Sequence, residues 1–256
     1  LNETKIYMIN FFKNLNKIRK KKRFKKKIIK KFLNPLEKKF KYSYQIFTYQ
    51  KKNEISELCE KYGSDKGYIN FDLKKPFNWK PHNYSIFYDD LFSDVKDQVE
   101  LVFECGIGTN NLNFTSNMTE TGKPGASLRV WKNYFKNANI YGADIDKDIL
   151  FEEDRIKTFH VDQMNENLVQ QMWSNVNKNN FDLIIDDGLH TFDAGMIFFK
   201  NSFSKLKKNG KYIIEDVHFS YLEKMANALI EYEPKIIILK NEDYHKDNNL
   251  ILITKK

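Results

Sequence analysis

Two short apolar runs that end in adjacent carboxylates place the strongest constraint on how this 256-residue chain can fold. One run covers residues 181–187, and residues 212–216 repeat the pattern downstream. Uninterrupted apolar runs of this kind are typical of strands buried in a parallel sheet, and the carboxyl ends of such strands open onto the crevice where α/β sheets bind ligands. The runs therefore predict two neighbouring strands that deliver four carboxylates to one small volume: Asp186, Asp187, Glu215 and Asp216.

These four carboxylates repel one another strongly unless a cation or a proton lies among them. Carboxylate oxygens are the ligands that Mg²⁺ and similar hard divalent ions prefer, so the pattern predicts a metal site. His190 follows the first pair, and a histidine suits a general base near neutral pH. Two alternatives stay open: His190 caps the helix that follows it, or His218 acts as the base.

Seven apolar runs, separated by helical or loop segments, follow residue 99. This alternation predicts an α/β fold with a doubly wound, Rossmann-like sheet of seven mainly parallel strands. Two helices are expected before the sheet, over residues 55–62 and 82–92, and Gly63 is expected to end the first of them. The seven runs cover residues 100–105, 139–144, 157–161, 181–186, 211–215, 235–240 and 249–254.

Positive charge is concentrated at the N-terminal end of the chain. Residues 1–52 carry 18 Lys and Arg against two Glu, whereas the remaining residues carry 25 against 32 acidic residues. We therefore expect a basic, partly helical leader over residues 1–52 and a mildly acidic domain over residues 53–256. A basic amphipathic leader suits peripheral contact with an anionic membrane or with a second subunit of a homo-oligomer, and the acidic body argues against specific nucleic-acid binding.

The sequence also bears on where the protein works. No apolar run approaches the roughly 18 to 20 residues that a membrane span needs, and no secretory signal pattern is apparent. Two cysteines, Cys59 and Cys105, are too few for a disulfide framework. The expected location is the cytoplasm.

A glycine pair follows the first run of the predicted sheet, at residues 106–108, where the backbone can approach a ligand closely. Asp144 ends the second run and is the first candidate to accept hydrogen bonds from a ribose, with Asp146 as the second. Asp162 and Gln163 end the third run, where an adenine edge could be recognised. Each acidic strand end could instead be a helix N-cap, but several at one edge favour a ligand site.

Short motifs follow one another in a defined order: residues 61–66, 82–84, 104–108, 125–131, 141–145, 162–163, 185–190 and 215–216. This series resembles the S-adenosylmethionine-dependent O-methyltransferases of the mycinamicin (macrolide sugar) type, over roughly residues 55 to 225. The resemblance implies a class I methyltransferase domain over residues 53–256, with S-adenosyl-L-methionine and Mg²⁺ or a similar divalent cation as cofactors. It also implies methyl transfer to a hydroxyl of a sugar or sugar-nucleotide acceptor. Asn110 departs from the pattern, because many methyltransferases have a third glycine there.

The resemblance also implies roles for individual residues. It makes Asp187, Glu215 and Asp216 the metal ligands and His190 the base. Asp186 is expected to face the cofactor, because adjacent side chains on a strand point to opposite sides. The other residues expected on the cofactor side are Glu104, Gly106, Asp144, Asp162 and Gln163, with Ser64 and Arg129 near the methionine end.

Two other functions remain as alternatives at this point. An acidic cluster with a metal could support hydrolysis or phosphoryl transfer on a Rossmann-like fold. The chain lacks the Gly-Lys-Ser/Thr loop that binds nucleoside triphosphates, and this argues against phosphoryl transfer from a nucleoside triphosphate. A nonenzymatic binding module that acts through the basic leader is the other alternative.

Overall fold

The computed structural model describes residues 43–47, 52–67, 75–239 and 246–256. Contacts divide the chain into two units, residues 1–43 and 44–256, and the second unit is described here. The helical part of the leader that the sequence predicts before residue 42 lies outside the described residues.

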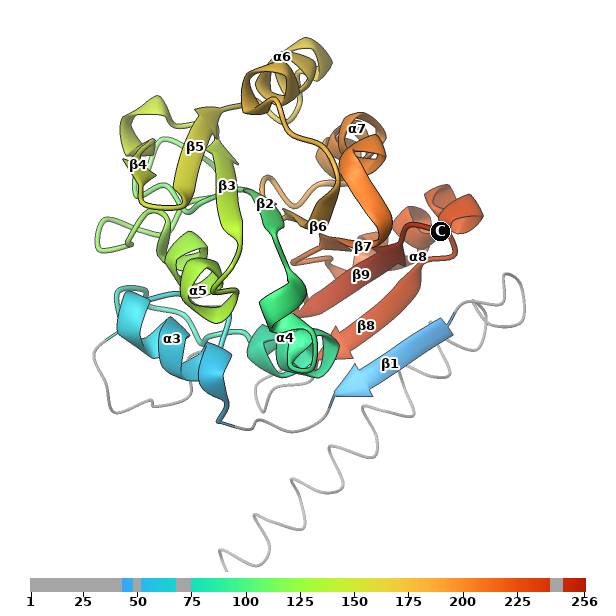
Figure 1. Ribbon diagram of the computed structural model, residues 1–256, viewed down its shortest axis with the longest axis horizontal. Coiled ribbons are helices and arrows are strands. Elements are labelled where there is room, and N and C mark those ends of the chain that lie inside the picture. Colours follow the sequence, from blue (N-terminus) through green and yellow to red (C-terminus); the bar gives the residue numbers. More distant parts are fainter. Residues whose placement is uncertain (1–42, 48–51, 68–74, 240–245) are drawn as a thin grey trace, which may run out of the picture. The chain divides into compact units, whose positions relative to one another are not determined.

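One mixed sheet forms the centre of the domain, in the order β1-β8-β9-β7-β6-β2-β3-β5-β4 (Figure 1). Four pairs are parallel, β2 with β3, β2 with β6, β3 with β5 and β6 with β7. Antiparallel pairs join β7 to β9, β8 to β9 and β4 to β5. The strands are β1 (Ser43–Phe47), β2 (Leu101–Cys105), β3 (Asn139–Asp144), β4 (Glu152–Glu153), β5 (Ile156–His160), β6 (Phe181–Asp186), β7 (Leu206–Ile214), β8 (Lys235–Leu239) and β9 (Asn249–Thr254).

The seven strands expected from the sequence are all present, as β2, β3, β5, β6, β7, β8 and β9, and the doubly wound α/β class is confirmed. Two short strands were not expected. β4 extends one edge of the sheet, and β1 extends the other edge beside β8 although it lies within the range assigned to the leader. Phe47 of β1 is buried against Phe87, with ring centroids 6.2 Å apart, so the end of the basic range packs onto the domain.

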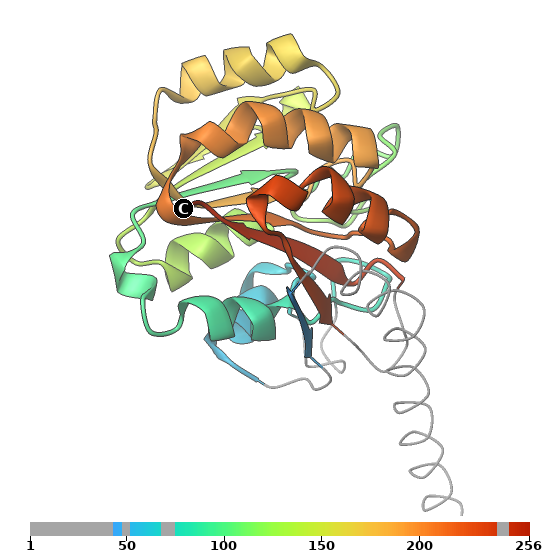
Figure 2. The ribbon, with the colours of Figure 1, turned by 90° about the vertical axis from the view of Figure 1, so that its right-hand side faces the viewer.

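Helices cover both faces of the sheet (Figure 2). One group consists of α3, α4 and α5, and the other of α6, α7 and α8, with packing inside each group. Among the described residues, none of the helices has the length and apolar character that a membrane crossing requires. The helices are α3 (Glu54–Tyr62), α4 (Tyr84–Phe92), α5 (Ala126–Tyr134), α6 (Glu166–Val176), α7 (Phe192–Ser202) and α8 (Phe219–Ala228), joined by short 3₁₀ turns at Lys96–Gln98, Lys147–Ile149, Phe203–Lys205 and Ile230–Tyr232.

Capping residues define both ends of α3 and thereby set the direction of the segment that follows it. Asn53 and Ser56 form a capping box, in which each side chain accepts from the other residue's backbone N–H at 2.9 Å. Gly63 ends the helix in the left-handed conformation, φ 83°, as the sequence predicts. The backbone N–H groups of His82 and Ser85 then donate to the carbonyls of residues 65 and 66, which ties this turn to the start of α4.

Every residue of β6 is buried, because helices cover the sheet on both sides. Asp182 is the polar exception near the start of this strand. Its Oδ2 accepts hydrogen bonds from the backbone N–H groups of Glu100 (2.9 Å) and Leu101 (3.0 Å), and Lys207 pairs with its Oδ1. The Asp182 carboxylate therefore links β6 to the start of β2 by hydrogen bonds.

We expect Asp182→Ala to lower the free energy of unfolding by about 1–3 kcal/mol, because two backbone donors lose their partner. Chemical denaturation measures the change. Glu223→Ala, at an exposed position of α8, is the control and should stay within about 0.5 kcal/mol of the parent protein. Equal stability of the two variants would contradict this role of Asp182.

Candidate active site at the carboxyl edge of the sheet

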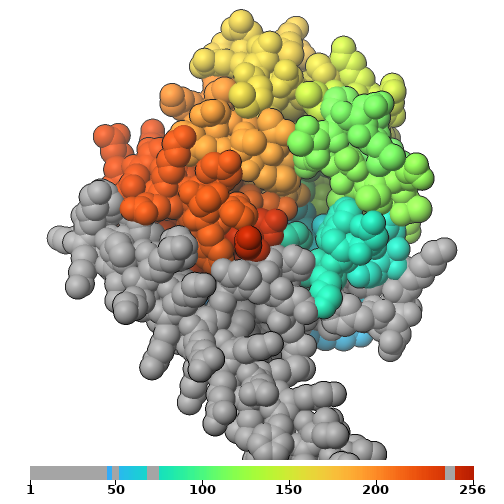
Figure 3. Space-filling model, turned by 180° about the vertical axis from the view of Figure 1, so that it is seen from behind, coloured from blue at the N-terminus to red at the C-terminus, as the bar shows by residue number. Residues whose placement is uncertain are grey.

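A cavity of about 550 Å³ lies at the carboxyl ends of β2, β3, β5, β6 and β7. Figure 3 shows the hollow between the green segment that follows β2 and the orange segments that follow β6 and β7. Its volume lies in the range of about 300–1,000 Å³ that is usual for small-molecule sites. Residues from the strand ends, from loop 113–118 and from the segment before α4 line it.

Hydrogen bonds between successive strand ends hold the edge in register. The N–H of Gly106 donates to the carbonyl of Ala143 at 2.8 Å, and the N–H of Asp187 donates to the carbonyl of Cys105 at 2.9 Å. Gly106 adopts φ 86°, and a Cβ at this position would lie 2.0 Å from the Asp187 carbonyl oxygen. Glycine is therefore required where the chain leaving β2 passes under the loop after β6.

Acidic and amide side chains line one end of the cavity, as expected for the cofactor side. Asp144 is 6% exposed, and its oxygens accept from the N–H groups of Ile107 (2.8 Å) and Asp146 (3.0 Å). Gln163 donates to Asp186 Oδ1 at 2.6 Å and accepts from the N–H of Leu189 at 2.9 Å. These contacts fix the side chains that border the glycine turn, and Asp162 lies beside them in the cavity wall.

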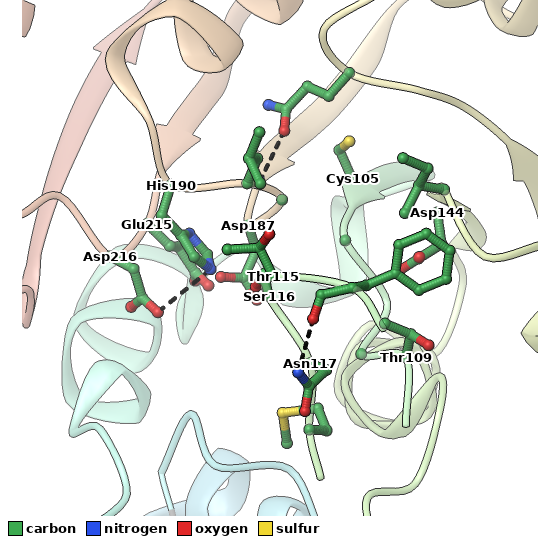
Figure 4. Close-up of a pocket in the computed structure, with 18 of the residues that line it drawn as sticks. Cys105, Thr109, Thr115, Ser116, Asn117, Asp144, Asp187, His190, Glu215 and Asp216 are labelled. Atoms are coloured by element: carbon green, nitrogen blue, oxygen red, sulfur yellow. Dashed lines mark hydrogen bonds and ion pairs between the residues drawn. The ribbon is translucent and has the colours of Figure 1, made fainter. Parts of the chain in front are cut away.

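Asp187, His190 and Asp216 form a compact group at the other end of the cavity (Figure 4). Each offers one ligand atom, and these atoms all lie within 4.8 Å of one another. His190 Nε2 is 3.8 Å from Asp216 Oδ2. Such a spacing lets the group surround a single ion.

Lys66 connects this group to a second set of carboxylates. Its Nζ lies 2.6 Å from Asp187 Oδ2 and 3.3 Å from Glu104 Oε1, and it also contacts Glu215 Oε2. The Lys66 side chain is only 4% exposed. Glu215, expected as a metal ligand, lines the cavity but is paired with this ammonium and lies outside the three-residue group.

Aromatic side chains from α4 hold the two carboxylates that follow β7. Tyr88 donates to Glu215 Oε1 at 2.5 Å, and Tyr84 donates to Asp216 Oδ1. His82 stacks on Tyr84 with ring centroids 4.6 Å apart and places its Nε2 3.6 Å from Asp216 Oδ1. The two tyrosines lie one helical turn apart, so a single face of α4 serves both carboxylates.

Burial and charge shift the site's pKa values in opposite directions. Burial raises the pKa of Glu215 well above its ordinary value, although Lys66 opposes the shift. For Asp216, burial also favours the neutral acid, but His82 and His190 outweigh it and lower the pKa. Burial raises the pKa of Asp186 to about 6. Asp216 is therefore the carboxylate of this cluster that is best stabilised in its ionised form.

Two members of the cluster adopt a backbone conformation that side-chain-bearing residues seldom use. His190 has φ 56° and Asp216 has φ 52°, both in the left-handed region. Such residues cost of the order of 1–3 kcal/mol each and persist where surrounding contacts enforce them. Both follow a strand end, so the local strain turns their side chains toward the cavity.

The structure brings eight of the predicted site residues to the large cavity. These are Gly106, Asp144, Asp162, Gln163, Asp187, His190, Glu215 and Asp216. It places the other four elsewhere. Glu104 is buried beneath the cavity against Lys66 and Trp131, and Ser64 is buried beside Cys59. Asp186 faces away from the large cavity, and its position is described below.

Arg129 does not line the cavity. Its Nη2 lies 2.6 Å from Glu153 Oε1, its Nη1 donates to the carbonyl of Pro124 at 2.9 Å, and its guanidinium lies over the Phe151 ring. The Arg129 side chain is therefore held by Pro124, Phe151 and Glu153. The resemblance gave the residue's place in a motif but not the direction of its side chain.

The structure also shows what each of the two histidines contacts. The N-cap of α7 is Thr191, which accepts from the N–H of Ala194, so His190 does not cap that helix. His218 is the N-cap of α8 and bonds the Ser220 hydroxyl at 2.7 Å. His218 does not line the large cavity.

Sequence reasoning gave no role to Lys66 or His82, and for Tyr84 and Tyr88 it left a core position and a place in the acceptor wall equally open. Lys66 and His82 stood in motifs that carried the resemblance, and Tyr84 and Tyr88 share the spacing of one helical face. Their contacts join residues more than a hundred positions apart in sequence. The sequence therefore indicated that Tyr84 and Tyr88 share one face of a helix, but it did not indicate which carboxylates they contact.

The cluster is chemically suited to a divalent cation. Lys66 neutralises only part of the charge of Glu104, Asp187 and Glu215, and Asp216 adds a further carboxylate. Oxygen ligands from Asp187 and Asp216 match the preference of Mg²⁺, and an imidazole nitrogen also binds divalent metals. The remaining cavity, with its glycine turn and acidic strand end, has the shape and polarity of a nucleoside site.

Known proteins give an independent view of the same domain. The chain is 31% identical over 172 residues to mycinamicin VI 2''-O-methyltransferase of Micromonospora griseorubida, which covers 67% of this chain. It is 28% identical over 174 residues to 8-demethyl-8-alpha-L-rhamnosyl tetracenomycin-C 2'-O-methyltransferase of Streptomyces olivaceus, which covers 68% of it. The chain is related to the mycinamicin-type sugar O-methyltransferases. It spans 38% and 40% of the length of these two relatives.

A solved structure supports this relationship and the class I methyltransferase fold. It is a MycE methyltransferase from the mycinamycin biosynthetic pathway, in complex with Mg and SAH. It superposes with a TM-score of 0.57 at 26% identity, over 81% of this chain and 56% of that one. No family model matches the chain.

We expect Lys66→Met to lower the free energy of unfolding by about 3–5 kcal/mol, because the substitution leaves the buried Glu104 and Glu215, and the partly buried Asp187, without their cation. Denaturation of the metal-free protein measures the change. Lys136→Met, at an exposed position, is the matched control and should change stability by less than about 0.5 kcal/mol. A Lys66 variant as stable as its control would show that the ion pairs contribute nothing.

Proposed function

We propose that this chain transfers a methyl group from S-adenosylmethionine to a hydroxyl of a sugar-like or sugar-nucleotide acceptor, with the help of a divalent cation. The observation that carries the proposal is the convergence of a glycine turn with an acidic strand end, and of the group Asp187, His190 and Asp216, on one cavity. The relatives named above catalyse O-methylation of sugars in larger natural products, and the MycE structure contains Mg and SAH.

The cofactor end of the cavity has the groups that a nucleoside needs. Asp144 is held by two backbone N–H groups and retains lone pairs that can accept from ribose hydroxyls. Asp162 and Gln163 border the same space and can orient the adenine ring of the cofactor. Gly106 and Gly108, both with positive φ, let the backbone approach the ligand closely.

Asp187 and Asp216 would hold the cation, with Glu215 close to them behind Lys66. When bound, S-adenosylmethionine supplies an activated methyl group on sulfur, and the cation supplies positive charge that lowers the pKa of a nearby hydroxyl. Tyr84 and Tyr88 orient Asp216 and Glu215 by donating to them. These contacts would keep the carboxylates in place for a bound cation and acceptor, and alignment of the acceptor oxygen with the methyl carbon is the main demand of this reaction.

His190 is the proposed base. Its Nε2 faces Asp216 at the cluster, and its side chain lines the cavity. As the acceptor oxygen forms its bond to the methyl carbon and the carbon–sulfur bond breaks, the hydroxyl proton passes to this nitrogen. Asp216, which keeps its charge, stabilises the imidazolium that results.

Loop 113–118 supplies the wall next to the proposed acceptor position. Thr115, Ser116 and Asn117 line the cavity there, and Asn117 donates to the carbonyl of Phe114 at 2.8 Å (Figure 4). Hydroxyl and amide groups suit a polyhydroxylated acceptor, because each can donate and accept hydrogen bonds.

The reaction is tested by incubating the full chain with S-adenosylmethionine and a panel of sugars and sugar nucleotides. With Mg²⁺ present we expect methylated product and S-adenosylhomocysteine, both detected by mass spectrometry. Excess EDTA should abolish product, and added Mg²⁺ should restore it, since the carboxylate cluster requires the ion. Turnover that ignores chelation would contradict the metal-assisted part of the proposal.

We expect His190→Ala to lower turnover by about 10²- to 10⁴-fold while leaving the dissociation constant for S-adenosylmethionine unchanged, because only proton transfer is lost. Calorimetry and the methyl-transfer assay measure the two quantities. His218→Ala is the matched control, since that histidine caps α8 outside the cavity, and it should keep near-parental turnover. Full activity of the His190 variant would remove His190 from the reaction.

A further inference from the structure

A second, much smaller cavity lies behind the acidic cluster, between the ends of β6 and β7 and the helices α7 and α8. Its volume is about 10 Å³. Asp186 and His190 line it from the strand side, and Gly195, Tyr221 and Met225 line it from the helices. It shares His190, Glu215 and Asp216 with the large cavity, but not Asp186.

Two of the residues that line this small cavity have a buried polar atom without a protein partner. These atoms are Asp186 Oδ2 and His190 Nδ1, neither of which makes a hydrogen bond to a group in the described part of the chain. The other polar atoms of both side chains have neighbours, because Gln163 donates to Asp186 Oδ1 at 2.6 Å and His190 Nε2 lies near Asp216. Asp186 as a whole is 3% exposed. Unpartnered polar atoms this deeply buried are rare, and each calls for a partner.

The size and polarity of the cavity identify that partner. A site needs about 10–15 Å³ of accessible volume and two to four polar contacts to hold a water molecule. We propose that a buried water binds here and bridges Asp186 Oδ2 and His190 Nδ1. The water donates to the carboxylate and accepts from the imidazole, so both groups gain the hydrogen bond that the protein does not supply.

The bridge would decide which nitrogen of His190 carries the proton. Asp216 Oδ2, 3.8 Å from Nε2, favours a proton on Nε2, where the lone pair could no longer act as a base. A water that donates one hydrogen to the Asp186 carboxylate can either donate its second hydrogen to a bare Nδ1 or accept from Nδ1–H. The bond to the carboxylate polarises the water oxygen and makes it the better acceptor, so the second arrangement is favoured, which places the proton on Nδ1 and leaves Nε2 free. Asp186 is then a positioning residue for His190. This consequence rests on the proposed function, whereas the water site does not.

Gly195 provides a direct way to test the cavity. A Cβ added at this position would lie 3.6 Å from Asp186 Oδ2 and 3.2 Å from the flexible end of Met225. The residue lies within α7 and has no positive φ, so alanine fits the backbone there. Gly195→Ala therefore occupies the space without changing a polar group.

The main experiment is ¹⁵N NMR of the full, histidine-labelled chain without divalent metal, so that Asp216 is free to contact Nε2, at about pH 8, where a histidine is ordinarily neutral. Loss of a signal in His190→Gln assigns the resonance. We expect Nδ1–H in the parent protein and Nε2–H in Asp186→Asn, because the new amide donates to the water and reverses its orientation. Gly195→Ala should show the same reversal, and Lys200→Ala, an exposed change on the same helix, should not.

Two further readouts make the result independent of the reaction. Alanine is a better helix former than glycine, so a raised melting temperature of Gly195→Ala indicates a dry cavity. A lowered melting temperature supports the bridge only together with a water in the parent density, because the new Cβ also crowds Met225 at 3.2 Å. High-resolution crystallography should show the water directly. In the methyl-transfer assay, Asp186→Asn should lose about 10- to 100-fold in turnover with unchanged affinity for S-adenosylhomocysteine, as is usual when a supporting hydrogen bond is removed.

The outcomes separate the two proposals. Nε2–H in the parent protein overturns the placement of the proton on Nδ1 and with it the positioning role of Asp186, because a bridging water can also donate to a bare Nδ1. A raised melting temperature in Gly195→Ala with no water in the density overturns the bridge itself. Nδ1–H with a bound water in a protein that methylates no acceptor keeps the bridge and rejects the proposed function. An Asp186→Asn variant that retains full turnover despite the reversed tautomer removes Asp186 from the positioning of the base.

Discussion

The alignment of parallel strand ends is the constraint on which the rest of the structure depends. Because β2, β3, β6 and β7 stop at one edge, the residues just beyond them are forced into a common volume. The sequence fills that volume with carboxylates, and their mutual repulsion must be offset. Lys66, the tyrosines of α4 and two histidines do part of this, and a divalent cation suits the remainder.

The segment from α3 to α4, which precedes β2 in sequence, supplies side chains to the site. α3 ends at Gly63, the following turn is tied to α4, and this connection aims Lys66 at the strand ends. One face of α4 supplies Tyr84 and Tyr88 to the same carboxylates. The acidic edge therefore belongs to two parts of the chain, of which one provides negative charge and the other provides cations and hydrogen-bond donors.

Much of this arrangement could be predicted from the sequence, because buried parallel strands leave a clear pattern of apolar runs. The runs that end at Asp144 and Asp186 coincide with β3 and β6. β1 was missed because its short sequence lies in a basic region, where charge dominated the interpretation. Side-chain direction was the other limit: Arg129 turns to Glu153, and Asp186 turns to the small cavity, although both occupy expected positions in motifs.

The ion pair between Lys66 and Glu215 has a consequence for how the protein matures. Its two members are separated by 149 positions, and the strands from β2 to β7 lie between them in sequence. Contacts of such long range form only after the intervening chain has closed, so they belong to the late stages of folding. A full-length chain that is not yet folded would present its acidic strand ends without this counter-charge. Formation of the ion pair therefore requires that the segment after α3 and the end of β7 have come together.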